Sequence, residues 1–101
     1  MILLVERAIY WRRPDDNRLE SALCTKRIAV ERMPTIGGSL WDGEWELRPV
    51  RALDHSAGRV ALEPCSATLT TTKELVGNYS THGWTITPND PYDEAQFCYQ
   101  R

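Results

Sequence analysis

A chain of 101 residues, 42% hydrophobic and 26% charged, has the size and composition of one small folded domain, so residues 1–101 are taken as a single domain. Its net charge of −2 at pH 7 argues against bulk attraction to nucleic acid or to an anionic membrane. No apolar run approaches the roughly 20 residues that span a bilayer, so we expect no membrane partner.

The N-terminal segment and the cysteines predict a cytoplasmic protein. The apolar run of residues 1–5 ends at Glu6 and Arg7 and lacks the basic flank and cleavage site of a secretory signal, so we interpret it as the start of a β-strand. The 3 cysteines are widely spaced and odd in number, unlike an oxidised scaffold, and they lack the paired spacing of a zinc site. We therefore expect reduced thiols, no metal and no other cofactor.

The first third of the chain predicts a strand, a turn and a second element that is either a helix or a strand. Residues 2–12 are expected to form a strand in which Leu3, Val5, Ile9 and Trp11 share one face and Leu4, Glu6 and Tyr10 lie on the other. Residues 14–17 carry the turn signal Pro-Asp-Asp-Asn. Residues 18–27 fit either a short helix or the second arm of a hairpin. We favour a strand over residues 23–33, ended by Pro34.

Asp42-Gly43 is the strongest hairpin signal in the chain. Both residues accept positive φ, as the tight turns between antiparallel strands require. Trp41 and Trp45 flank this turn, and we expect a contact between them across the two strands. The surrounding residues 28–64 are typical of consecutive short antiparallel strands.

The apolar positions of the next strand slip by one residue at Pro49. A β-bulge or an edge position there would absorb the slip and bend the sheet. A turn over residues 54–58 and a strand over residues 59–63 follow. A Thr-rich strand is expected over residues 67–72.

The C-terminal third changes character and predicts a helix. Over residues 72–82 apolar side chains and His82 recur at helical spacing, and Gly83 stands where a C-terminal cap belongs. A final strand is expected over residues 84–87. Residues 94–100 fit either a short strand or a frayed helix.

Together these elements predict an α+β fold. The sheet is expected to be mainly antiparallel, with about five to six strands, and strongly curved, because the bend at Pro49 lets a small sheet curl into a barrel-like shape. One short helix, near residues 72–82, completes the domain.

Two runs in the middle of the chain carry a resemblance: Met33-Pro34-x-x-Gly37 and Trp45-x-Leu47-x-x-Val50. This pattern resembles that of small uncharacterised bacterial β-rich proteins encoded on mobile elements such as integron gene cassettes and phage. The resemblance implies a compact β-rich fold and a bacterial source. It rests on turn and core residues and transfers no catalytic residue.

The run Asp54-His55-Ser56 holds the residue types of a hydrolase triad. Triad members converge from separate elements, whereas these residues are consecutive and precede Ala57-Gly58, so we interpret the run as a turn. The sequence also lacks a glycine-rich phosphate loop. A non-enzymatic protein is therefore favoured over an enzyme.

A mixture of tryptophans and arginines supplies the candidate ligand- or partner-binding residues: Trp11, Arg13, Trp41, Trp45, Arg48 and Trp84. Aromatic rings that stack on bases and cations that contact phosphates are typical of small nucleic-acid-binding barrels. The net charge disfavours that class. Each tryptophan also fits a place in the core, and the sequence does not decide which of them are buried and which are exposed.

We expect a small non-enzymatic binding or protein-interaction module. Exposed aromatic surface would let it form a homo-oligomer or bind another protein. Two alternatives are a small-barrel nucleic-acid-binding protein and a small-molecule-binding protein or enzyme with a pocket in the barrel mouth.

Overall fold

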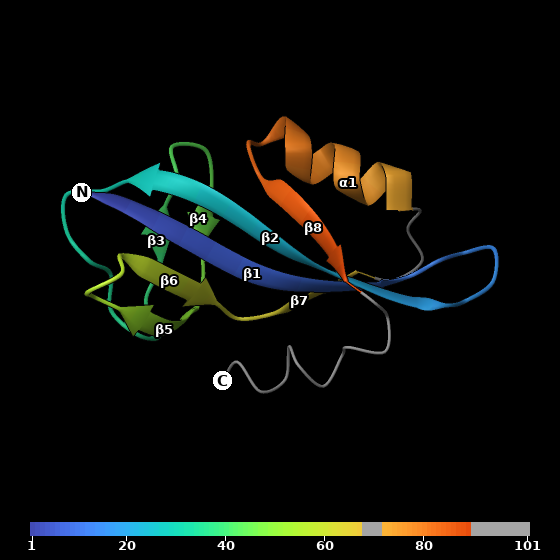
Figure 1. Cartoon of the computed structure of the whole chain (residues 1–101), viewed down its shortest axis with the longest axis horizontal. Helices are drawn as coiled ribbons and strands as arrows, with labels where there is room; N and C mark the ends of the chain where they lie inside the picture. Colours follow the sequence, from blue (N-terminus) through green and yellow to red (C-terminus); the bar gives the residue numbers. More distant parts are fainter. Residues whose placement is uncertain (68–71, 90–101) are drawn as a thin grey trace.

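A large open sheet, a separate two-stranded hairpin and a helix make up the fold (Figure 1). The computed structural model describes residues 1–67 and 72–89. In chain order the elements are β1 (Ile2–Arg12), β2 (Leu19–Ala29), β3 (Leu40–Trp41), β4 (Glu46–Leu47), β5 (Val50–Asp54), β6 (Arg59–Leu62), β7 (Cys65–Ala67), α1 (Thr72–Thr81) and β8 (Thr85–Asn89). The predicted α+β class and the predicted helix are confirmed.

β1 and β2 form a long antiparallel hairpin in the middle of the large sheet. They pair from Ile2 opposite Ala29 to Arg12 opposite Leu19, and the turn between them contains Asn17 with φ of 56°. Residues 18–27 are therefore the second arm of a hairpin and not a helix. The strand expected over residues 23–33 begins and ends earlier, because pairing with β1 sets its bounds instead of Pro34.

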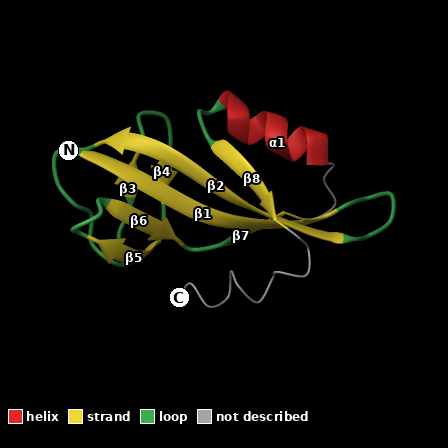
Figure 2. Cartoon of the chain, in the orientation of Figure 1, coloured by secondary structure: helices red, strands yellow, loops and turns green. Residues whose placement is uncertain are grey.

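The large sheet is open and is not strongly curled, so the predicted barrel-like shape is wrong (Figure 2). Its strand order is β5-β6-β1-β2-β8, which leaves β5 and β8 at opposite edges, and β7 pairs with β1. β1 pairs in parallel with β6 and β7, while the other described strand pairs are antiparallel. The sheet is thus mostly antiparallel, as predicted.

The slip at Pro49 separates two strands instead of bending one. β4 ends at Leu47 and pairs with β3 in the two-stranded sheet, whereas β5 begins at Val50 and pairs with β6 in the large sheet. A register shift between Val50 and Ala52 supplies a bulge two residues later than expected. The chain changes sheets at Pro49, so the slip does not curl the large sheet.

The core lies on one face of the large sheet. Alternate residues of β1 are buried there, as predicted: Leu3, Val5, Ile9 and Trp11. α1 contributes Leu75 to the same cluster, and the β3–β4 hairpin contributes Leu40 and Leu47. Arg7 occupies the remaining position of the alternating set, so a charged side chain projects from the core face of β1.

The Asp54-His55-Ser56 run lies in the turn between β5 and β6, as predicted. Oδ1 of Asp54 accepts hydrogen bonds from the Ser56 hydroxyl at 2.9 Å and from the Ala57 N–H at 3.1 Å. These bonds hold the turn in the manner of an Asx turn. The aspartate is therefore used locally and does not orient the histidine.

The remaining predicted elements have mixed outcomes. The strand expected over residues 59–63 is β6, and the strand expected over residues 84–87 overlaps β8. β7 covers the first residue of the strand expected over residues 67–72, whose greater part lies outside the described residues. The segment 94–100 also lies outside them.

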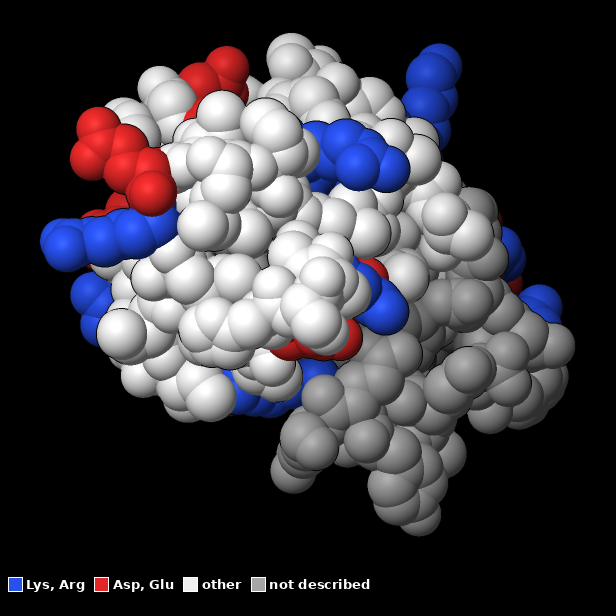
Figure 3. Space-filling model, turned by 60° about the vertical axis from the view of Figure 1, so that its left-hand side comes forward, with Lys and Arg blue, Asp and Glu red and all other residues white. Residues whose placement is uncertain are grey.

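Charged side chains on the face drawn in Figure 3 occur in small separate groups, with broad uncharged areas between them. Basic and acidic groups lie side by side in the described chain; the Arg59 guanidinium, for example, is ion-paired with the Glu6 carboxylate. The face in Figure 3 therefore presents no continuous basic stripe.

Candidate functional site

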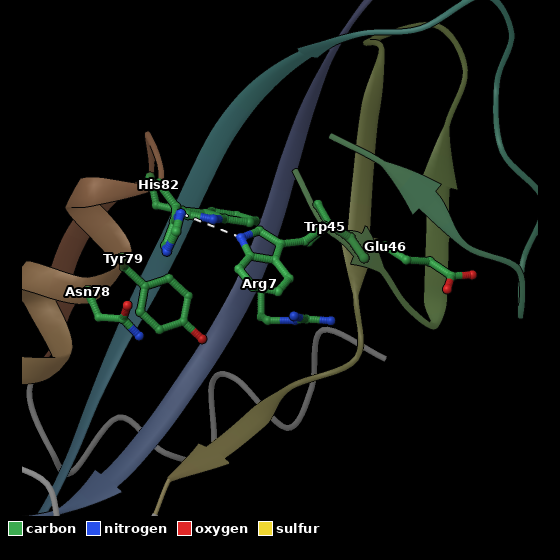
Figure 4. A pocket seen from close by; sticks show the side chains of 8 residues that line it. Arg7, Trp45, Glu46, Asn78, Tyr79 and His82 are labelled. Atoms are coloured by element: carbon green, nitrogen blue, oxygen red, sulfur yellow. Dashed lines mark hydrogen bonds between the residues drawn. The ribbon is translucent and has the colours of Figure 1, made fainter. Parts of the chain in front are cut away.

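A pocket of about 410 Å³ opens between α1 and the β3–β4 hairpin, on the core face of the large sheet (Figure 4). Its volume lies in the range of small-molecule sites. The described residues that line it come from β1, from the hairpin, and from α1 with the turn that follows: Arg7, Trp45, Glu46, Leu47, Asn78, Tyr79, His82 and Trp84. Segments far apart in the sequence thus form one concave site.

The end of α1 places three of the lining side chains. Gly83 has φ of +85°, its N–H donates to the Ser80 carbonyl at 3.1 Å, and the Trp84 N–H donates to the Tyr79 carbonyl at 3.1 Å. This pair of bonds is the Schellman cap, and its usual apolar contact is present, because the Tyr79 and Trp84 rings meet at 6.0 Å and 76°. The predicted cap therefore turns Tyr79, His82 and Trp84 toward the pocket.

Asp42 shapes the hairpin loop that carries Trp45. Its Oδ1 accepts the backbone N–H of Glu44 at 2.8 Å and of Trp45 at 2.6 Å, and its Oδ2 accepts from Lys26 Nζ at 3.0 Å. Burial by itself would raise the pKa of Asp42. The hydrogen bonds from Trp45, Glu44 and Lys26 outweigh burial and hold that pKa below its ordinary value.

Lys26 of β2 joins the two walls of the pocket. Besides Asp42, its Nζ donates to the His82 carbonyl at 2.7 Å, just beyond the end of α1. The same ammonium lies 5.9 Å from the centroid of the Trp84 ring. A cation at this place also suits the negative end of the helix dipole. One side chain therefore ties the hairpin to the helix end.

His82 makes two contacts through a single ring nitrogen. Its Nδ1 lies 2.7 Å from Oε2 of Glu44 and 3.4 Å from Nε1 of Trp45, and the Trp45 and His82 rings meet edge to face at 5.6 Å. The carboxylate requires a proton on Nδ1, whereas the indole N–H requires a lone pair there. The hairpin and the helix end can thus be bonded in two alternative ways.

Arg7 is the cation of the pocket. Its Nε donates to the Glu63 carbonyl at 3.1 Å and its Nη2 to the Arg48 carbonyl at 2.8 Å. Among the residues that the structure describes, no carboxylate forms an ion pair with it, although it is only partly exposed. Figure 4 shows the Glu46 carboxylate turned away from Arg7. Among the described residues, the guanidinium is therefore held in place by neutral acceptors.

Tyr79 supplies a hydroxyl group to the pocket. Burial raises the pKa of its phenol to about 12, and the charge of Arg7 offsets only part of that rise. The phenol therefore keeps its proton at neutral pH and can act as a hydrogen-bond donor, whereas it is a poor base.

The structure brings together two of the six residues proposed from the sequence. Trp45 and Trp84 line the pocket, with Trp45 55% and Trp84 7% exposed. Arg48 contributes its carbonyl to Arg7, and its own side chain is exposed. The contact expected across the hairpin is replaced by pairing of Trp41 with Glu46.

The other residues proposed from the sequence lie elsewhere. Trp11 is 2% exposed and belongs to the core, and Trp41 is 62% exposed on the hairpin. Arg13 lies at the distant β1–β2 turn, where Asp16 and Glu20 are its ion-pair partners. These three do not form a common site with the pocket.

Sequence reasoning did not propose Arg7, Tyr79 or His82. A signal for Arg7 was present, because it interrupts the buried alternation of β1 with a charge. The cap at Gly83 could likewise have indicated that His82 lies at the end of a helix. What neither signal reveals is the hairpin that faces them.

Comparisons with protein-family models, with curated proteins and with solved structures find no match for this chain. Residues 1–67 and 72–89 contain no cluster of three or more histidine, cysteine or acidic side chains that could hold a metal ion. In the same part of the chain no helix has the length and apolar content to cross a bilayer. The interpretation of the pocket therefore rests on its own residues.

Proposed function

We propose that this protein is a non-enzymatic binding module whose ligand site is the pocket between α1 and the β3–β4 hairpin. The observation that carries the proposal is that Lys26 makes two hydrogen bonds. One goes to Asp42 in the hairpin and the other to the His82 carbonyl at the helix end. The positions of the two walls relative to each other are thereby fixed by contacts within the protein. Preorganisation of this kind lowers the entropic cost of binding.

The chemistry of the lining supports binding over catalysis. The described lining residues include aromatic rings and hydrogen-bonding groups but no serine, threonine or cysteine that could act as a nucleophile. Tyr79 stays protonated at neutral pH because its pKa is about 12. Nδ1 of His82 is already engaged by residues of the hairpin.

A pair of helix variants tests this proposal. Asn78 and Ser80 are both exposed on α1, but only Asn78 lines the pocket. Asn78→Trp should fill the site, and Ser80→Trp is the matched control. The readout is the Trp45 indole N–H signal in NMR spectra titrated with indole-3-carboxamide and with indole-3-carboxylate.

The proposal expects at least one of the two compounds to shift the Trp45 signal in the wild type and in Ser80→Trp, and neither to shift it in Asn78→Trp. It is contradicted if neither compound shifts that signal in the wild type. Equal shifts in Asn78→Trp and in the wild type would also place the ligand elsewhere.

A protein-interaction role, with self-association, is the second candidate. It is favoured by Trp41, which is 62% exposed on the same hairpin as the exposed Trp45. Light scattering of the wild type and Trp41→Ser at equal micromolar concentrations tests it. A wild-type dimer that becomes a monomer in Trp41→Ser supports it, and a wild-type monomer counts against it.

The nucleic-acid alternative has less support. Arg13 is neutralised by acidic neighbours, and Trp11 and Trp84 are buried. The bacterial mobile-element source and the cytoplasmic location expected from the sequence stay predictions.

A further inference from the structure

We infer that the ligand of this pocket carries one carboxylate on a flat ring, and that Arg7 binds the carboxylate; this inference rests on the proposed function. The argument concerns the unused donors of Arg7, the charge around it, and the arrangement of the aromatic rings.

The guanidinium of Arg7 is oriented but not saturated. A guanidinium is planar and has five N–H donors, so two bonds to it also fix its plane. The carbonyls of Glu63 and Arg48 take one donor of Nε and one of Nη2. Nη1 donates to no acceptor among the described residues, so its N–H groups are available to a ligand that enters the pocket.

The charge of the site selects an anion with one negative charge. Arg7 has no acidic partner in the described part of the chain, and Glu46 points away from it (Figure 4). Lys26 is not a second cation for the ligand, because Asp42 already neutralises it. Glu44, beside His82, adds a negative charge near the hairpin rim. A carboxylate therefore matches the site, whereas a doubly charged phosphate would bring excess negative charge.

The aromatic residues select a flat ring. Trp45 meets His82 at 87°, and Tyr79 meets Trp84 at 76°, so both pairs are edge to face. In such a pair one ring presents only its edge, and its own faces stay free of the partner. Trp45 is also 55% exposed. A flat ring of the ligand can stack on such a face while its carboxylate reaches Arg7.

Isothermal titration with three probes tests the inference: indole-3-carboxylate, indole-3-carboxamide and phenyl phosphate. The first two have nearly the same shape and differ in charge. Either probe can accept a hydrogen bond from Arg7, but the carboxylate adds an attraction between opposite charges, so we expect it to bind the wild type about tenfold more tightly than the carboxamide. Phenyl phosphate should bind more weakly than the carboxylate.

Two arginine variants assign the effect to Arg7. In Arg7→Met both probes lose the guanidinium donor, but only the carboxylate also loses an attraction between opposite charges, so it should lose its advantage over the carboxamide. Arg27→Met removes an equal charge from an exposed position of β2 outside the pocket and should behave as the wild type. Circular dichroism confirms that each variant is folded. In Arg7→Lys, which keeps the charge but loses the planar set of donors, the advantage of the carboxylate should shrink.

The outcomes separate the two claims. Equal binding of the carboxylate and the carboxamide overturns the ligand class but leaves the binding module standing. Tighter binding of phenyl phosphate than of the carboxylate also overturns it. Absence of binding by all three probes contradicts the proposed function itself. A carboxylate preference that survives in Arg7→Met shows that Arg7 is not the recognition group.

Discussion

Nε1 of Trp45 lies 3.4 Å from Nδ1 of His82, although 37 residues separate them in the sequence. The same nitrogen lies 2.7 Å from the Glu44 carboxylate. A ring nitrogen cannot donate a proton to one neighbour and accept one from the other at the same time. The proton on His82 therefore decides which hairpin residue is bonded to the end of α1.

Removal of the Glu44 carboxylate should leave Nδ1 of His82 to the Trp45 indole. The carboxylate requires a proton on Nδ1, whereas the indole N–H requires a lone pair there, so the two contacts compete. We expect the Trp45 indole N–H chemical shift in Glu44→Gln to differ from that of the wild type at the same pH.

The control for this prediction is His82→Asn, on whose background Glu44→Gln should not move the Trp45 signal. A Trp45 signal that is the same in Glu44→Gln and in the wild type would show that the two contacts do not compete for Nδ1.

Lys26→Met should destabilise the protein by about 2 kcal/mol, because it leaves the Asp42 carboxylate buried without its cation. Urea unfolding measures the loss. Arg27→Met, at the neighbouring exposed position, should stay within about 0.5 kcal/mol of the wild type. Equal stabilities of the two variants would refute the role given to Lys26.

The ionised carboxylate of Asp42 should stabilise the fold at neutral pH, and this stabilisation should be lost in acid. Its pKa in the folded protein lies below the ordinary value of 3.8, so the contribution is present above that value and is lost as the pH falls through the folded pKa. The difference in unfolding free energy between the wild type and Asp42→Asn should therefore shrink below about pH 4.

Asp15→Asn, which changes an exposed carboxylate of the β1–β2 turn, provides the comparison for Asp42→Asn. Its difference from the wild type should be small at every pH. A constant difference for Asp42→Asn from neutral to acid pH would contradict the assignment.

Two glycines of the helix region should respond in opposite ways to alanine. Gly83→Ala places a side chain at φ of +85°, with its Cβ 3.4 Å from Cε of Lys26, and should cost about 1 kcal/mol. Gly77 lies within α1 with open space around it, so Gly77→Ala should stabilise by about 0.5–1 kcal/mol. Thermal unfolding of both variants gives the two signs, and equal signs would contradict the cap.

Turns and helix ends that depend on a particular residue, such as a glycine, could be predicted from a few neighbouring residues. The hairpin at Asp42-Gly43 and the cap at Gly83 each need only a few neighbouring residues, and both are present, although Gly43 has positive φ and Asp42 does not. Whether the sheet closes depends on strands far apart in the sequence, above all on the parallel pairing of β1 with β6 and β7. The slip at Pro49 carries no information about that pairing.

The candidate site was less accessible to sequence reasoning than the fold. The alternation of β1 places Arg7 on the core face, but a lone charge there has meaning only once α1 and the hairpin are known to form a pocket around it. In the same way Trp11 and Trp45 are equivalent as sequence, and tertiary packing alone buries one and exposes the other.

The unfolding free energy of Arg7→Met tests the central claim most directly, without knowledge of the ligand. If Arg7 serves a ligand, its removal should leave the free protein as stable as the wild type within about 0.5 kcal/mol, or more stable, because a partly buried charge disappears. Its bonds to Glu63 and Arg48 lie at exposed atoms, where water can replace them. A loss of more than about 2 kcal/mol would mean that Arg7 serves the fold, and would contradict the account.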